Sequence, residues 1–410
     1  MVAIEATTVK DLKVSMANKV KKFREWISKQ RNFIFARYTK DANETQEPER
    51  SLIALPAPIR KKLVSLIGEL PSNPADKEAI ASVLEESYKI WRENPQNADN
   101  SIVVLSSPVT AVSRILSETL EEWAAEKQLP LKLLSLTARP YAVETIESKL
   151  EHELKSKVND DEDEPLEVVV IPNLSWCFLR SLEGLEGIEY LQSLLCSGSK
   201  NRFWIIGAGE VGWEYLNSVC AIEAYCGEVF VLPTIEPEKM ESWLDPVVDE
   251  LGITFEEPRI DKQIFDGDRD NKKGYFKHLA DLSKGVGTVA IQIFLKSVCY
   301  EEAEEIEGIK IKHEHIEQNL VAQTPKLPEL PDFESADRYL LYSLLMHGDL
   351  TISALSQSLG DMESEVQARV QVLRREGIVE QKGQVLKINP IHYPKVKREL
   401  AANNFIINRN

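Results

Sequence analysis

The spacing of apolar residues changes twice along the chain and divides it into three parts. Between residues 59 and 93 apolar side chains recur every three to four residues, which places them on one face of a helix. From residue 101 to residue 232 they form short unbroken runs, and from residue 336 the helical spacing returns. We therefore expect a helical N-terminal region, a central sheet and a helical C-terminal part.

Five short apolar runs in the middle of the chain predict a buried sheet. Uninterrupted apolar runs are typical of parallel strands buried on both faces, and right-handed crossovers then place helices on both sides. The pattern predicts an α/β fold with a five-stranded parallel sheet and helices on both faces. The predicted strands are Ile102–Leu105, Leu131–Leu136, Val168–Ile171, Phe203–Ile206 and Val229–Leu232, and the main helices between them are Val112–Lys127, Tyr141–Lys157 and Leu179–Leu195.

The C-terminal part has the rhythm of a winged helix. A proline-rich connector over residues 325–332 precedes three predicted helices and a hairpin. The helices are Ala336–Met346, Thr351–Leu359 and Asp361–Glu376, and the hairpin covers residues 378–388. This order is typical of helix-turn-helix architecture.

Duplex DNA is one candidate partner of this winged helix. Its candidate contacts are Arg369, Arg374, Arg375 and Lys382. Acidic residues occupy the leading end of the third helix, which would repel phosphate, and residues 334–400 hold nine basic and nine acidic side chains. The same domain suits contact with a protein, so both interpretations stay open.

Charge is distributed unevenly along the 410 residues. The chain has a formal net charge of −17, which argues against a protein that coats nucleic acid or anionic membrane over most of its surface. Residues 1–40 carry ten basic and three acidic side chains, a net of +7, so the remainder sums to −24. We interpret residues 1–40 as a basic amphipathic helix, with contact residues Lys13, Lys21, Lys22, Phe23, Arg24, Trp26, Ile27 and Arg31. Such a helix suits an anionic membrane surface or an acidic protein, or docks on the acidic body of its own chain.

Several classes of protein are not supported by the sequence. No run of 18 apolar residues predicts a membrane span, and Glu5 precedes any apolar run that would read as a secretory signal. Five cysteines without a C-x-x-C pair predict small buried thiols in a reducing compartment. His313 and His315 lie in a charged stretch without a second ligand pair, so no metal site is expected. We expect a cytoplasmic protein whose membrane contact, if it has one, is peripheral.

The turn after the first predicted strand is where such folds bind phosphate. Residues 106–113 have the spacing of G-x-x-x-x-G-K-[ST], but Ser106 and Ala111 replace the glycines and Val112 replaces the lysine. The lysine would neutralise phosphate charge, and the glycines would let backbone N–H groups point at it. The predicted site is therefore a degenerate one, made of Ser106, Ser107, Thr110, Ala111, Val112 and Ser113, with Pro172 and Asn173 after the third strand, where an Mg²⁺-holding acid is expected.

In order and spacing, the chain from about residue 96 resembles P-loop NTPases of the AAA+/STAND type. The landmarks are SSPVTAVSRIL, VVVIPNL, RFWIIGAGEVGWEYLN, EVFVLPTIEPEKMESWL and LSKGVGTVAIQIFLKSV. The resemblance implies a P-loop NTPase-like core, a helical lid and a winged helix. Together with the N-terminal segments, five parts are expected. They are the basic amphipathic helix (1–40), the helical N-terminal region (41–95), the core (96–235), the lid (236–324) and the winged helix (325–410). No arginine lies in the segment that resembles the lid's sensor helix, residues 285–298.

A competing motif lies at Gly207–Gly212, which fits G-x-G-x-x-G and follows an apolar run. It predicts a dinucleotide-binding enzyme, although its strand is the fourth of the sheet and Pro233-Thr234 stands where the ribose-binding acid is expected. The preferred interpretation is an inactive ATPase-like scaffold or regulatory protein-interaction module, with no resident cofactor. Weak ATP or ADP binding stays compatible with it, because a helix N-terminus attracts anions. Whether the chain oligomerises and which protein it contacts are left open.

Overall fold

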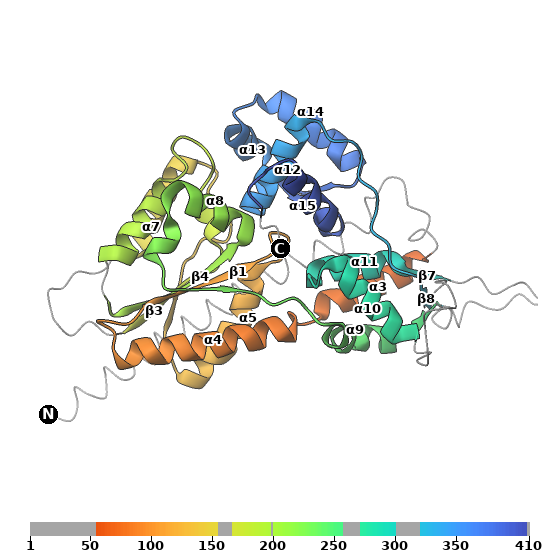
Figure 1. The fold of residues 1–410 in the computed structure, drawn as a ribbon, viewed down its shortest axis with the longest axis horizontal. Coiled ribbons are helices and arrows are strands. Elements are labelled where there is room, and N and C mark those ends of the chain that lie inside the picture. The colour runs from red at the N-terminus through yellow and green to blue at the C-terminus, as the bar shows by residue number, and fades with distance from the viewer. Residues whose placement is uncertain (1–54, 155–165, 198–199, 257–270, 301–319, 408–410) are drawn as a thin grey trace, which may run out of the picture.

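The computed structural model describes residues 55–154, 166–197, 200–256, 271–300 and 320–407. The predicted basic helix over residues 1–40, with all eight of its candidate contact residues, lies outside these ranges, as do His313 and His315. In Figure 1 the described residues form an α/β core, a mostly helical lid and a C-terminal domain that meet near the centre of the molecule.

The core contains the predicted five-stranded sheet. Its order is β2-β3-β4-β1-β5, and every neighbouring pair is parallel. The predicted α/β class is therefore confirmed. The strands are β1 (Ser101–Ser106), β2 (Leu131–Leu133), β3 (Glu167–Ile171), β4 (Arg202–Gly209) and β5 (Glu228–Val231).

Helices cover both faces of this sheet. On one face, α4 and α5 bury a cluster with Ile102, Val104 and Phe203. The alternate strand residues Val103, Trp204 and their neighbours point to the other face, against α6, α7 and α8. This alternation follows from the period of two along a strand. The helices are α4 (Pro74–Glu93), α5 (Val112–Lys127), α6 (Ile146–Leu154), α7 (Glu186–Ser197) and α8 (Glu210–Cys220).

Two helices of the core begin later than the sequence predicts. Helix α7 begins at Glu186 and not at Leu179, because residues 179–184 form a tight turn in which the Leu179 N–H donates to the Gly184 carbonyl at 2.8 Å. Any side chain at Gly184 would collide with that turn, since a Cβ there would lie 2.0 Å from the Leu179 oxygen. Helix α6 begins at Ile146, after a 3₁₀ turn over Val143–Thr145.

The lid contains α9 (Pro237–Leu251), α10 (Asn271–Ser283) and α11 (Gly287–Ser297). Helix α3 (Ala57–Glu69), which precedes the core in sequence, packs against α9 and α11. The sequence did not predict the small sheet of the lid, order β6-β8-β7, formed by β6 (Thr254–Phe255), β7 (Val298–Tyr300) and β8 (Leu320–Ala322).

The C-terminal domain has the predicted three helices and hairpin. They are α12 (Ser335–His347), α13 (Ile352–Leu359), α14 (Glu363–Arg375), β10 (Val379–Lys382) and β11 (Val385–Ile388). Two elements are additional: β9 (Leu350–Thr351) pairs with β11, and α15 (Tyr393–Ala402) follows the hairpin. Helices α12 and α15 lie toward the rest of the molecule, whereas α14 lies at the outer edge (Figure 1).

Three further predictions concern the chemistry of the chain. None of the helices in the described ranges is long and apolar enough to cross a membrane. Within the same ranges, no group of three or more His, Cys, Asp or Glu side chains is arranged to hold a metal ion. None of the five cysteines forms a disulfide, and Cys177 and Cys299 are buried as predicted, but Cys196 is exposed.

Candidate functional site

The loop between β1 and α5 lies at the carboxyl edge of the sheet, where the sequence predicts a phosphate site. Ser106 pairs with Gly209 of the neighbouring strand, so the loop begins beside the start of α8. None of residues 106–113 has a positive φ. In one type of concave anion-binding loop, right-handed and left-handed residues alternate and turn successive N–H groups to one side. The loop between β1 and α5 is not of that type.

Several side chains of this loop are buried or contact other protein groups. Val112, in the lysine position, is 3% exposed and packs in the cluster of α4 and α5. Ser113 is buried in the first turn of the same helix. The Thr110 hydroxyl lies 3.4 Å from that of Thr288 in the lid, and Ser106 Oγ donates to the Ser107 carbonyl at 3.2 Å. None of them carries a positive charge.

The two residues that follow β3, Pro172 and Asn173, contact neighbouring protein groups. The Pro172 carbonyl lies against Gly207 of β4, where a Cβ would be only 2.4 Å away. The Asn173 side-chain oxygen accepts from the Ser175 N–H at 3.1 Å and from the Ser175 hydroxyl at 2.7 Å. Asn173 thus caps the following 3₁₀ turn, and neither residue supplies a carboxylate for Mg²⁺.

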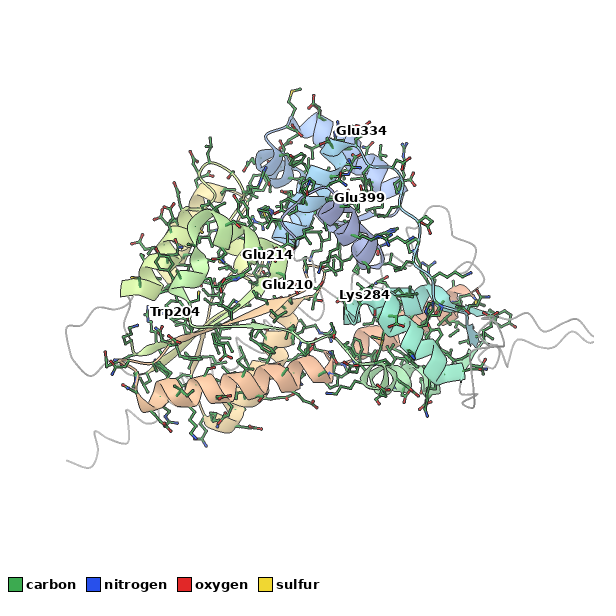
Figure 2. All side chains as sticks on the ribbon, viewed as in Figure 1. Trp204, Glu210, Glu214, Lys284, Glu334 and Glu399 are labelled. Atoms are coloured by element: carbon green, nitrogen blue, oxygen red, sulfur yellow. The ribbon has the colours of Figure 1, made fainter. Side chains whose placement is uncertain are left out.

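A residue of the C-terminal domain covers this edge of the sheet. Tyr393 is buried and lies near the Ser107 side chain, whose buried hydroxyl has no hydrogen-bond partner among the described residues. Burial, followed by the nearby Glu210 carboxylate, raises the pKa of Tyr393. Glu210 begins α8 directly after β4, and burial raises its own pKa while Lys397 opposes the rise. Figure 2 shows Glu210 and Glu214 on the side of the core that faces the C-terminal domain.

A buried arginine joins the core to the C-terminal domain. Arg139 follows β2, and its guanidinium donates to four carbonyls, those of Phe178 (2.9 Å), Asp349 (2.6 Å), His347 (3.4 Å) and Ser175. Two of these acceptors belong to the core and two to the C-terminal domain. Burial lowers the pKa of Arg139 to about 10, so the group stays charged at neutral pH.

His347, at the end of α12, completes this junction. Its Nε2 accepts from the backbone N–H of Arg180 at 3.1 Å, and its Nδ1 lies 2.8 Å from the Ser343 carbonyl. This pairing requires the neutral ring with the proton on Nδ1. Burial, and then Arg139, lower the pKa of His347 well below its usual range. The Arg180 side chain also reaches the C-terminal domain and donates to the Ser358 carbonyl at 2.8 Å.

A cavity of about 290 Å³ opens beside the loop between β1 and α5. Its walls come from α3, α5, α9 and α11, and Asn389 and Pro390 of the C-terminal domain close one side. Apolar side chains such as Leu63, Trp243 and Ile291 form much of the lining. Asp76 also lines it, and burial raises the pKa of that carboxyl to about 6.

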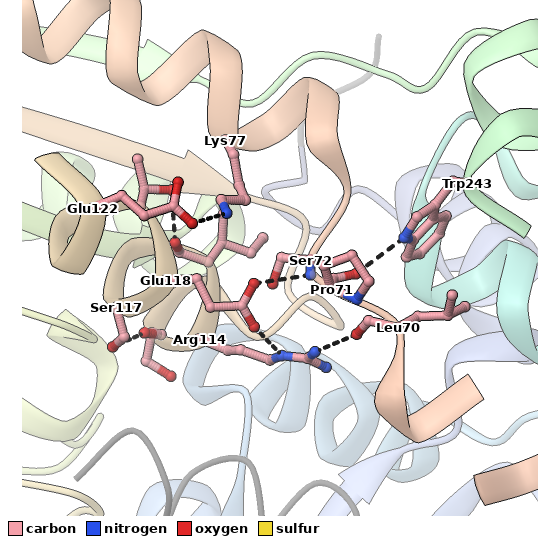
Figure 3. Close-up of polar contacts among 12 residues, drawn as sticks. Leu70, Pro71, Ser72, Lys77, Arg114, Ser117, Glu118, Glu122 and Trp243 are labelled. Atoms are coloured by element: carbon pink, nitrogen blue, oxygen red, sulfur yellow. Dashed lines mark hydrogen bonds and ion pairs between the residues drawn. The ribbon is translucent and has the colours of Figure 1, made fainter. Parts of the chain in front are cut away.

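Residues 70–72 hold the cavity wall in place by three polar contacts (Figure 3). The Arg114 guanidinium donates to the Leu70 carbonyl at 2.6 Å and pairs with Glu118 at 2.7 Å. The other Glu118 oxygen accepts from the Ser72 N–H at 2.9 Å, and the Trp243 indole donates to the Pro71 carbonyl at 3.0 Å. Arg114 is therefore engaged with protein groups.

The glycines of the G-x-G-x-x-G motif serve packing in this structure. Strand β4 runs through Gly209 and α8 begins at the next residue, so no glycine-rich loop separates them. Gly212 lies against α12, where a Cβ would be 2.5 Å from the Met346 carbonyl oxygen. Trp213 and Leu216 pack inward, as expected if the motif is a turn followed by a helix.

The four candidate DNA contacts are not equivalent. Arg369 is engaged within its domain, with Glu334 at 3.2 Å and Asp337 at 3.6 Å. Arg374 and Arg375 are exposed at the end of α14, and Lys382 ends β10. The structure thus presents two arginines together at one end of an outward-facing helix.

Comparison with known proteins identifies no sequence relative. No family model matches the chain, and no curated protein matches it. Solved structures that match include the Thermotoga maritima RuvB Holliday junction branch migration motor, at 13% identity over 81% of this chain and 96% of that chain, with a TM-score of 0.31. The Aeropyrum pernix ORC2 protein, in ADPNP–ADP complexes, matches at 13% identity over 82% and 96%, with a TM-score of 0.36. Cdc6p from Pyrobaculum aerophilum matches at 13% identity over 82% and 96%, with a TM-score of 0.35.

The structure itself shows an α/β fold, with a five-stranded parallel sheet and the loop between β1 and α5 at the carboxyl edge of that sheet. Sequence reasoning missed Arg139, Tyr393 and His347, which join the C-terminal domain to the core. Nothing near Arg139 in sequence marks a contact that lies 210 residues away.

Proposed function

We propose that this chain is a catalytically inactive P-loop ATPase-like protein that serves as a scaffold or regulatory protein-interaction module. The loop between β1 and α5 carries the proposal. It has neither the lysine of the motif nor the alternating right-handed and left-handed backbone that forms one type of phosphate-binding loop. The buried Tyr393 and the Glu210 carboxylate lie where anionic phosphate would have to approach.

Calorimetry with Mg-ATP and with ADP, paired with a phosphate-release assay on the full chain, tests this proposal. We expect no tight binding and no release above a protein-free blank. Ser113→Ala is the matched variant, because Ser113 is the one residue of the motif that is kept. Release by the wild type that disappears in Ser113→Ala would overturn the proposal. Weak ATP or ADP binding without turnover is consistent with it, since the N-terminus of α5 attracts anions.

A DNA-associated regulator is the second candidate, and the exposed Arg374 and Arg375 favour it. We infer that residues 325–410 form a winged helix, in which α14 is the element that would enter a DNA groove. Glu363 and Glu365 in its first turn oppose phosphate, and Arg369 is engaged by Glu334. Salt-dependent binding to duplex DNA that weakens in Arg374→Ala and Lys382→Ala would establish this candidate in place of a protein-contact role.

A further inference from the structure

Helix α14 has a second face that no part of the described structure covers. Its inner face buries Val366, Val370 and Leu373. On the opposite side, four exposed positions follow each other at steps of three, four and three residues, a spacing that forms one continuous stripe. This outer stripe consists of Glu365, Ala368, Val372 and Arg375.

The chemistry of the outer stripe is self-complementary. Its leading end is acidic, its centre holds the small Ala368 and the 57% exposed Val372, and its far end is basic. Within the described residues, no ion pair engages Glu365 or Arg375, whereas Arg369 beside the stripe pairs with Glu334 and Asp337. The stripe therefore carries charges of both signs that are available to a partner.

We propose that α14 pairs with α14 of a second copy of this chain, in an antiparallel arrangement around a two-fold axis that crosses the outer stripe between Ala368 and Val372. In this register Glu365 faces Arg375 of the second copy, and Ala368 faces its Val372. The symmetry makes each pair occur twice, as in any isologous interface. The antiparallel direction also places the two helix dipoles in opposition, whereas a parallel pair would bring the two Glu365 side chains together.

The pairing is weak and sensitive to salt. Helix α14 has 13 residues and is about 20 Å long, so one helix pair buries less surface than a standard stable interface. The inference rests on the proposed function in one respect, because it uses the C-terminal domain as a protein-contact surface.

Charge reversal tests the pairing, with sedimentation velocity on the full chain at low and high salt as the measurement. We expect a concentration-dependent mass above that of a monomer at low salt. Glu365→Arg and Arg375→Glu should each weaken the association by at least about tenfold, because each puts like charges opposite one another twice. The double variant Glu365→Arg/Arg375→Glu should restore it. Arg374→Glu is the matched control, since Arg374 lies off the stripe and its reversal should change the association much less.

Three results would overturn the pairing: a monomer at about 0.5 mM chain and low salt, a double variant that stays dissociated, or an equal effect of Arg374→Glu and Arg375→Glu. Circular dichroism melting shows that each variant is folded. Loss of helix stability cannot explain recovery of the association in the double variant. Both charge reversals oppose the helix dipole, so the double variant should have the least stable helix of the three. Phosphate release measured on the same samples separates the proposals: a monomer without turnover rejects only the pairing, and a dimer with turnover rejects only the proposed function.

Discussion

Gly207 and Gly212 show how a motif that predicts a dinucleotide site can arise from packing. Neither has a positive φ, so neither is needed for a left-handed turn. Each instead permits a close approach of backbone, to the Pro172 carbonyl in the sheet and to the Met346 carbonyl of the C-terminal domain. The absence of a side chain at Gly212 is what lets α12 lie directly on α8.

Gly212→Ala should therefore destabilise the chain. The added Cβ would lie 2.5 Å from the Met346 oxygen, and overpacking of this kind costs about 1–3 kcal/mol, more than the gain of up to about 1 kcal/mol in helix propensity. Gly274→Ala is the matched control, because Gly274 is also helical and a Cβ added there would have no atom within 4 Å. It should stabilise by up to about 1 kcal/mol. Urea denaturation of the three proteins measures both changes, and equal effects of the two substitutions would contradict the packing role.

For single residues, the absence of a motif residue is easier to predict from the sequence than a contact made by a distant residue. The motif has a fixed spacing after the strand, so the sequence alone shows that Val112 stands in the lysine position. The tyrosine that covers the same loop comes from residue 393, in another domain. No local spacing records that contact, because it exists only after the two domains pack together.

Helix α12 contacts the core through the side chain of His347, a group that can take up a proton in acid. His347 is neutral in the folded chain, and its Nε2 accepts a backbone N–H. Protonation would turn that acceptor into a donor facing another donor, beside the positively charged Arg139 and Arg180.

Acid should weaken the folded state through this histidine. The folded-state pKa of His347 lies below the ordinary value of 6.5, so the unfolded chain takes up the proton first. The stabilising contribution is complete above about pH 6.5 and is lost as the pH falls toward the folded-state pKa, at up to about 1.4 kcal/mol per pH unit. His347→Gln keeps an acceptor but does not titrate. The difference in unfolding free energy between wild type and this variant should shrink from pH 7 to pH 5, and a constant difference would contradict the assignment.

At the scale of elements, the strands of the core were predictable and those of the lid were not. Each core strand is a continuous apolar run because helices bury both of its faces, and that burial is visible in the sequence. The lid strands are two or three residues long, and Thr254 of β6 pairs with Val321 of β8. Such short pairings leave no periodic pattern. Helix α15 was not predicted, although its Val396 and Leu400 are buried at a helical spacing.

In the whole molecule, one continuous apolar cluster runs from α3 through one face of the sheet and the lid to the C-terminal domain. Polar contacts reinforce it: Arg139 and Arg180 join the core to the C-terminal domain, and α11 packs on the 3₁₀ turn at Pro390–His392. The three parts seen in Figure 1 are therefore joined by buried surface and buried hydrogen bonds.

We expect the core, lid and C-terminal domain to unfold as one cooperative unit. Six tryptophans lie in the described residues, all within the core and lid from Trp91 to Trp243, so their fluorescence follows these parts, while hydrogen exchange of amides in α12 and α14 follows the C-terminal domain. In urea both probes should give one midpoint.

Arg139→Lys should give the two probes different midpoints, because one ammonium group cannot reach four carbonyls. The carbonyls left buried without a donor should lower the free energy of unfolding by about 2–4 kcal/mol. Arg338→Lys, in a partly exposed pair with Glu399, is the control and should change stability by less than about 1 kcal/mol. Two separate midpoints in the wild type would mean that the C-terminal domain folds independently of the junction that Arg139 makes.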